Sequence, residues 1–189
     1  SRWNKEREKT RASYASDIVK LYKEDTGKDI VPTQTDVLKF ELWEEQRHIC
    51  LYTGEQIGIT DFIGPNPKYD IEHTVPRSVG GDSTLENMTL CSSRFNRDIK
   101  KAKLPSELAN HDEIMARLDT WKENIEKLRK EADKIHTYSS MDKGVKDGLI
   151  QKRHRIRLEL EYWEGKYKRF KMTEVPEGFS RRQGAGIGL

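Results

Sequence analysis

The sequence has few cysteines, and the two that are present do not form a paired motif. Cys50 and Cys91 are too few for a disulfide framework, and neither belongs to the C-x-x-C pair that is typical of structural zinc sites. These features argue against a disulfide-rich secreted protein and indicate a reducing cytosol. A single bridge between the two cysteines stays open at this point.

Long apolar runs are also missing. No stretch approaches the roughly 20 apolar residues of a membrane span, and no signal-peptide pattern opens the chain. We therefore expect a soluble cytoplasmic protein without a membrane partner.

Hydrophobic residues are scarce, at 34% against 35% charged residues, so we expect a modest core and elements with wide polar faces. The 189 residues suffice for one substantial domain. The net charge of +3 is too small to indicate nucleic-acid binding by itself. Because Ser1 opens the chain and the glycine-rich GAGIGL closes it, we expect an excised domain.

Helical patterns precede the middle of the chain. Residues 5–24 are predicted to form an amphipathic helix, since apolar residues recur four and three positions apart at Tyr14, Ile18 and Leu21. Thr33 followed by Asp36 is a capping-box pattern, which predicts that a second helix begins there.

Two apolar seams follow Pro105. The first predicts one long helix and contains Ile114, Leu118, Trp121, Ile125, Leu128, Ala132 and Ile135. The second contains Ile156, Leu160, Trp163, Tyr167 and Phe170. Because HTYSSMDKG separates the seams, we expect an antiparallel helical hairpin in which both seams pack into a core.

Helical periodicity is lost between Cys50 and Ser92, where glycine and proline punctuate short runs. YDIEHTV and ENMTLCS are strand candidates, and SVGGDST is the loop between them. Ser92 or Ser93 can cap a helix over RFNRDIKKA. The predicted local order is strand, loop, strand, helix.

Glu72 and His73 are adjacent within the first of these strands. Neighbouring strand residues point to opposite faces, so their side chains converge only where the strand bends. Pro76 and the Gly80-Gly81 pair favour such a bend nearby. Asp70, on the same strand face as Glu72, is a second candidate for the carboxylate role.

Asn87 and Asn96 complete a set that can cleave a phosphodiester. A neutral His73 can deprotonate water, while carboxylate and amide oxygens hold a hard cation against the phosphate. Basic residues around Asn96 can neutralise neighbouring phosphates, although an ordinary exposed helix face explains them equally well. These basic residues are Arg94, Arg97, Lys100 and Lys101.

Three segments resemble the ββα-metal motif of HNH nucleases: YDIEHTVPRS, LENMTL and SSRFNRDIKK. An asparagine replaces the second signature histidine. Upstream, LKFELWEEQRHICLYTGEQI resembles the HNH domain of the RNA-guided DNA endonuclease of type II CRISPR systems, the Cas nine family. The resemblance covers residues 35–101, and the later hairpin is similar in character only.

The resemblance implies an α+β, mainly helical fold with a ββα-metal core, flanking helices and a C-terminal helical hairpin. It also implies that the whole chain is a single HNH nuclease domain. Its parts are an N-terminal helical linker over 1–34, the core over 35–104, the hairpin over 105–171 and a C-terminal linker over 172–189.

Roles follow from the same resemblance. His73 corresponds to the general base, and Glu72 and Asn96 correspond to ligands of Mg²⁺, for which Mn²⁺ can substitute. Asn87 corresponds to a support that orients the His73 loop. The implied products are a 5′ phosphate and a 3′ hydroxyl.

The implied partners are a DNA target strand paired with a guide RNA and the remainder of the effector, which includes a RuvC domain. A phage inhibitor protein is a conceivable partner, and the implied location is the bacterial cytoplasm. Two alternatives stay open. One is a free-standing HNH nicking, homing or restriction endonuclease, and the other is a non-enzymatic helical protein-interaction module.

Overall fold

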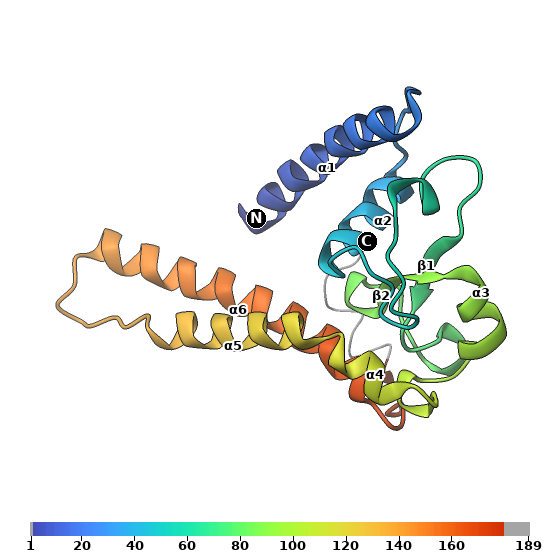
Figure 1. Cartoon of the computed structure of the whole chain (residues 1–189). Helices are drawn as coiled ribbons and strands as arrows, with labels where there is room; N and C mark the ends of the chain where they lie inside the picture. Colours follow the sequence, from blue (N-terminus) through green and yellow to red (C-terminus); the bar gives the residue numbers. More distant parts are fainter. Residues whose placement is uncertain (1, 180–189) are drawn as a thin grey trace.

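The computed structural model describes residues 2–179, with side chains from residue 8 onward. Two helices precede a small sheet, and three longer helical segments follow a short one (Figure 1). The bounds are α1 Arg2–Thr26, α2 Gln34–Glu45, β1 Tyr69–His73, β2 Met88–Ser92, α3 Ser93–Phe95, α4 His111–Ala116, α5 Asp119–Asp133 and α6 Lys143–Lys171. This architecture confirms the α+β, mainly helical fold class.

The sheet has two antiparallel strands, β1 and β2. Glu72 lies opposite Thr89, and His73 lies opposite Met88. The connection between the strands contains two short helical turns, η2 (Arg77–Val79) and η3 (Leu85–Asn87). Both predicted strands are therefore confirmed, and the last residue of β1 is the candidate base.

The predicted capping box forms at the start of α2. The Thr33 hydroxyl accepts a hydrogen bond from the Asp36 N–H at 3.0 Å, and the Asp36 carboxylate accepts one from the Thr33 N–H at 3.0 Å. Both donors would otherwise lack a partner within the helix, which explains why the helix begins there.

The helix predicted over RFNRDIKKA is wrong in its detail. Ser92 caps it, as one of the two alternatives stated, but only Ser93–Phe95 is α-helical. The chain then widens into a π-helical turn, η4 (Asn96–Lys100), in which the Lys101 N–H donates to the Asn96 carbonyl at 2.8 Å. A π turn holds one residue more than an α turn, so the side chains after Asn96 are rotated from the predicted positions.

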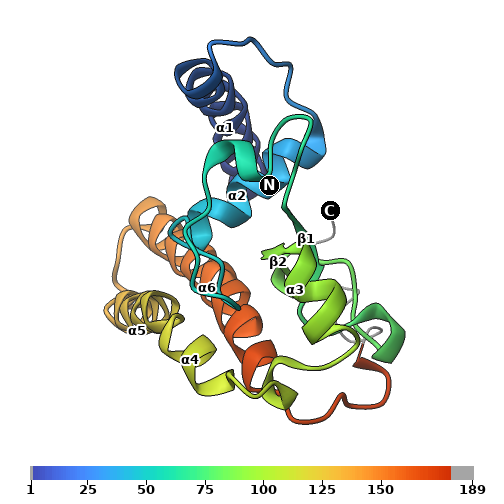
Figure 2. The same ribbon diagram turned by 45° about the vertical axis from the view of Figure 1, so that its right-hand side comes forward.

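The single long helix predicted from the first apolar seam is two helices. The backbone turns between α4 and α5, where the Leu118 N–H donates to the Met115 carbonyl at 3.1 Å. From there α5 runs beside α6, which confirms the helical hairpin (Figures 1 and 2). Trp121, Ile125 and Leu128 on α5 are buried, as the seam predicts.

The main core joins α2, the 50–63 segment, the sheet and the end of α6. Its members include Phe40, Trp43, Tyr52, Phe62, Leu90 and Phe170. Cys50 and Cys91 are buried in it as free thiols, so the bridge left open by the sequence is not formed.

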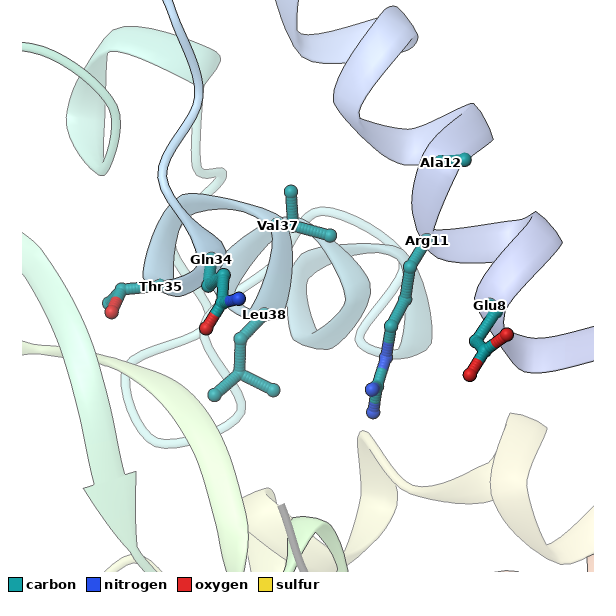
Figure 3. Close-up of a pocket in the computed structure, with 7 residues that line it drawn as sticks. All are labelled: Glu8, Arg11, Ala12, Gln34, Thr35, Val37 and Leu38. Atoms are coloured by element: carbon teal, nitrogen blue, oxygen red, sulfur yellow. The ribbon is translucent and has the colours of Figure 1, made fainter. Parts of the chain in front are cut away.

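A groove of about 530 Å³ lies between α1 and α2 (Figure 3). Glu8 and Arg11 line it from α1, and Val37 and Leu38 line it from α2. Its lining contains none of the candidate site residues, which lie on and around the sheet.

Lys166 attaches α6 to the sheet. Its fully buried ammonium donates to the backbone carbonyls of Met88 at 2.8 Å and Leu85 at 3.2 Å, and contacts Glu45 Oε1 at 3.3 Å. Burial lowers the pKa of Lys166 and raises the pKa of Glu45, while the attraction between the two charges opposes both shifts. One cation thus connects α2, η3, β2 and α6.

We predict that Lys166→Met lowers the free energy of unfolding by about 3–5 kcal/mol, because it leaves two buried carbonyls without this donor and the Glu45 carboxylate without its cation. Lys168→Met, at an exposed position of the same helix, is the matched control and should leave the urea midpoint nearly unchanged. Equal midpoints for the two variants would contradict the role of Lys166.

Candidate active site

His73 ends β1 and is half-buried. Burial lowers the pKa of its imidazole, and the positive charge of Arg77 is the next largest cause. Both causes favour the neutral form of the ring. A neutral, partly exposed imidazole can accept a proton from water, as a general base must.

Glu72 is buried, with only 1% of its surface exposed. Its Oε1 accepts a hydrogen bond from the Tyr52 hydroxyl at 2.8 Å and lies 3.1 Å from the Lys100 ammonium. Its Oε2 accepts a hydrogen bond from the Thr89 hydroxyl. Burial and the charge of Glu72 raise the pKa of Tyr52, which keeps that hydroxyl protonated and donating.

Glu72 and His73 lie on opposite faces of the sheet. β1 stays paired with β2 through His73, and the bend expected nearby comes directly after the strand, at Thr74 and Val75. The structure does not bring the two side chains together on one atom. Asp70 is exposed instead, and its Oδ1 lies 3.4 Å from Lys39 Nζ.

Asn87 fixes the chain that follows His73. Its fully buried amide accepts from the Val75 N–H at 2.8 Å and donates to the carbonyls of Val75 at 2.9 Å and Asp82 at 2.8 Å. Its backbone carbonyl accepts from the Thr74 N–H at 3.0 Å. These contacts are of the kind expected of a residue that orients the His73 loop.

Asn96 is part-exposed and begins η4. The segment that carries it lies against β1, since the Ser93 N–H donates to the Lys68 carbonyl at 2.9 Å and Lys100 Nζ donates to the His73 carbonyl at 3.0 Å. Asn96 is therefore on the same turn of chain that contacts the end of β1.

The basic residues around Asn96 do not form one exposed set. Arg94, Arg97 and Lys101 are exposed, and Arg97 pairs with Asp98 at 3.0 Å. Lys100 is only 1% exposed, because the π turn directs it toward Glu72. In this arrangement Lys100 cannot contact a phosphate, which corrects the prediction for that residue.

The predicted metal ligands fit a cation only in part. Among the side chains described, those of residues 8–179, no group of three or more His, Cys, Asp or Glu could hold a metal ion. The part-exposed amide oxygen of Asn96 is a suitable donor for a hard cation. Glu72 does not fit as a direct ligand here, because it is only 1% exposed and the Lys100 ammonium already lies 3.1 Å from its Oε1.

Residues 50–106 match the family described as HNH endonuclease. This region contains β1, β2, α3 and η4, and therefore His73, Asn87 and Asn96. The chain contains an HNH endonuclease domain similar to that of Cas9 proteins.

The relatives of this HNH domain are much longer proteins. CRISPR-associated endonuclease Cas9 1 of Streptococcus thermophilus is 35% identical over 60 residues, which cover 32% of this chain and 5% of that protein. CRISPR-associated endonuclease Cas9 of Staphylococcus aureus is 26% identical over 123 residues, which cover 65% of this chain and 11% of that protein. The chain thus spans a small part of the relatives that it matches.

A solved structure shares the fold of the HNH domain. Streptococcus thermophilus Cas9 in complex with the AGAA PAM aligns with a TM-score of 0.50 at 22% identity, over 61% of this chain and 12% of that chain. None of the helices in the described part of the present chain is both long and apolar enough to cross a membrane.

Sequence reasoning missed the residues that hold Glu72 inside the HNH domain. Thr89 is its partner across the sheet, and Tyr52 reaches it from the preceding segment. The strand register would have indicated Thr89, but a long irregular loop joins the strands, and such a loop does not fix register as a tight turn does. Tyr52 lies in the upstream segment that carries the family resemblance, but nothing in that segment indicated its contact with Glu72.

Gly81 permits the close packing of the loop after His73. A Cβ atom at this position would lie 1.7 Å from the Val75 carbonyl oxygen and 3.0 Å from Asn87 Nδ2. No Cβ atom fits 1.7 Å from a carbonyl oxygen, so only glycine allows the backbone at position 81 to approach Val75 this closely.

We predict that Gly81→Ala destabilises the HNH domain by about 1–3 kcal/mol, because the new methyl group displaces Val75 and loosens Asn87. Gly148→Ala is the matched control, since a Cβ at Gly148 on α6 meets no atom within 4 Å. That control should gain about 0.5–1 kcal/mol. Urea denaturation measures both, and a Gly81→Ala variant as stable as the parent would contradict the tight contact.

Proposed function

We propose that this chain is the nuclease domain of an RNA-guided DNA endonuclease and hydrolyses a phosphodiester of the strand paired with the guide RNA. The observation that carries the proposal is the part-exposed His73 at the end of β1, inside the region that matches HNH endonucleases. Asn87 supports the proposal because its hydrogen bonds fix Thr74 and Val75, the two residues after His73.

The proposed reaction is a hydrolysis in which His73 acts as general base. The imidazole takes a proton from a water molecule, whose oxygen bonds to phosphorus while the bond from phosphorus to the 3′ oxygen breaks. The departing oxygen takes a proton from solvent, and the products are a 5′ phosphate and a 3′ hydroxyl. Exposed Arg94, Arg97 and Lys101 are proposed to contact neighbouring phosphates.

HNH endonucleases generally depend on a divalent metal ion. We propose Mg²⁺ for this chain, with Mn²⁺ as a substitute, because oxygen donors suit hard cations. Asn96 supplies one such oxygen. Direct coordination by Glu72 requires its present contacts with Lys100 to change.

We propose that other parts of a longer protein determine which DNA strand this domain cuts. Pairing with the guide RNA selects the sequence in effectors of this kind, and a RuvC domain cuts the displaced strand. The proposed setting is the bacterial cytoplasm. A phage protein that covers the His73 surface is a further proposed partner.

We predict that His73→Ala, in the full-length effector with its guide and a duplex target, abolishes cutting of the guide-paired strand. General-base catalysis contributes typically about 10² to 10⁴ in rate, and alanine removes the base. The displaced strand should still be cut, so the product is a nicked duplex. Strand-labelled gels measure both rates.

His154→Ala is the control, because His154 is exposed on α6 away from the sheet. Cutting of both strands at parental rates by His73→Ala would show that His73 has a structural role only. Flanking sequence without RuvC segments would instead favour a free-standing HNH enzyme. A parent chain without metal-dependent nicking would favour a protein-interaction module.

The pH dependence of guide-strand cutting should reflect His73. Its pKa is lowered from the ordinary value of 6.5, so the rate should be constant above that value and fall to half at a lower pH, where the imidazole becomes protonated. Arg77→Gln removes one cause of the lowering and should move the half-rate point upward. An unchanged profile in this variant would contradict the influence of Arg77.

A further inference from the structure

The excess positive charge of the chain is concentrated at the far end of the helical hairpin. Residues 134–157 contain seven Lys or Arg and two Asp or Glu, a net charge of +5, whereas the whole chain has a net charge of +3. The remainder of the chain therefore has a net charge of −2. The small overall charge does not reveal this asymmetry, which favours an anionic partner at the hairpin end.

This basic end lies away from the sheet that carries His73. α5 and α6 project from the rest of the protein, and the loop that joins them is at the far end of the hairpin (Figure 1). Lys152 precedes Lys166, which attaches α6 to the sheet, by 14 residues, or about 21 Å along the helix. A partner bound at the hairpin end therefore contacts residues outside the candidate active site.

A groove of about 440 Å³ lies between the last turn of α5, the loop and α6. Lys134 and Lys152 line this groove, and both side chains are exposed. No ion pair described for residues 8–179 includes either lysine. One carboxylate, that of Glu131, also lines the groove, and it lies 4.0 Å from Lys127. The groove is therefore more positive than negative.

Apolar side chains are exposed at the same end. Tyr138 is 61% exposed and lines the groove, while Val145 and Ile150 are 56% and 40% exposed. An unpaired base can stack on an aromatic ring while neighbouring cations neutralise its phosphates. The bases of a double helix are stacked on one another and present only their edges in the grooves. The combination of exposed apolar groups and positive charge therefore favours a single strand over a duplex.

The groove has a defined shape because the hairpin has a core of its own. Ile135 and Ile156 belong to one buried cluster, which joins the start of the loop to α6. Within the loop, the Met141 N–H donates to the Tyr138 carbonyl at 3.1 Å. The Asp142 carboxylate then caps α6 by accepting from two N–H groups of its first turn. A groove that is already ordered loses little conformational entropy when it binds a partner.

We propose that this groove binds single-stranded DNA, with a base stacked on Tyr138 and phosphates beside Lys134 and Lys152. It is a second nucleic-acid surface, separate from the phosphate contacts proposed around Asn96. The choice of DNA rests on the proposed function, in which the chain acts on DNA. The binding itself does not require His73.

The test measures binding of the chain to a fluorescent oligomer of about 15 thymidines by anisotropy, with EDTA present to prevent metal-dependent cleavage. Lys134→Gln/Lys152→Gln should raise the dissociation constant at least about tenfold, because two phosphate contacts are lost. The slope of log K against log salt concentration should become shallower by about 1.4, since each contact with a single strand contributes about 0.7.

Tyr138 is tested by a pair of variants. Tyr138→Ser removes the ring and should raise the dissociation constant at least about fivefold, whereas Tyr138→Phe keeps the ring and should bind like the parent. Weaker binding by Tyr138→Phe equal to that of Tyr138→Ser would contradict stacking on this side chain. Equal urea midpoints show that the variants fold.

Lys20→Gln/Lys28→Gln is the matched control for charge. It removes an equal charge from two exposed positions, on α1 and just after it, and should change the dissociation constant by less than about twofold. Equal affinity for the oligomer in the parent and in Lys134→Gln/Lys152→Gln would overturn the proposal, as would absence of binding by the parent.

Other ligands compare the kinds of partner. Tighter binding of an oligouridine of the same length would assign the groove to RNA, tighter binding of a DNA duplex would assign it to a double helix, and tighter binding of a poly-glutamate peptide of equal charge would assign it to an acidic protein. Each of these results would overturn the proposal. His73→Ala should bind the thymidine oligomer like the parent, and the strand-labelled cleavage assay judges His73 separately. Failure of the proposed function and failure of this inference are thus distinguishable.

Discussion

A sheet of two strands is at best marginally stable in water, and the site of this protein is built on such a sheet. Side chains from other elements supply the hydrogen bonds that further strands would give. Gln46, just after α2, donates to the Leu90 carbonyl at 2.9 Å and accepts from the Leu90 N–H at 2.6 Å. Lys166 on α6 donates to carbonyls on both sides of Asn87. The helices thus position the strands through backbone groups of β2 and η3.

Two ion pairs are buried where side chains attach to the sheet and its loops, and burial removes their hydration. Glu72 with Lys100 and Glu45 with Lys166 are ion pairs that lost most of their hydration, and such pairs often add little net stability compared with apolar residues. Each pair does join different elements of the fold, and each ammonium also bonds backbone carbonyls. An apolar pair could fill the same volume in several orientations, whereas these contacts are satisfied in one. We therefore interpret the pairs as determinants of geometry, although removal of one partner alone, as in Lys166→Met, is destabilising.

The sequence predicted those features of the fold that depend on interactions between residues close together in the chain. The capping box at Thr33, both strands and the hairpin depend on residues close together in the chain, and each was predictable. The environment of Glu72 was not, because its partners come from three separate segments and from a register set by a long loop. Lys100 was assigned to the surface because a regular α turn was assumed, and the one extra residue of η4 changes its direction. The break between α4 and α5 was hidden since the apolar spacing continues across it.

The hairpin of α5 and α6, for which the sequence showed only a general similarity to the Cas9 family, is connected to His73 through a series of short contacts. Arg169 on α6 lies 3.3 Å from Glu86 and 3.8 Å from Asp82, in the loop that precedes β2. The Asp82 carbonyl accepts from Asn87, whose amide in turn holds Val75, two residues after His73. Because these groups are buried or nearly so, a shift of α6 against the sheet has to break one of the contacts or move this loop with it. The position of His73 is therefore tied to that of α6, although no hairpin residue contacts its side chain in the hydrogen bonds and ion pairs described.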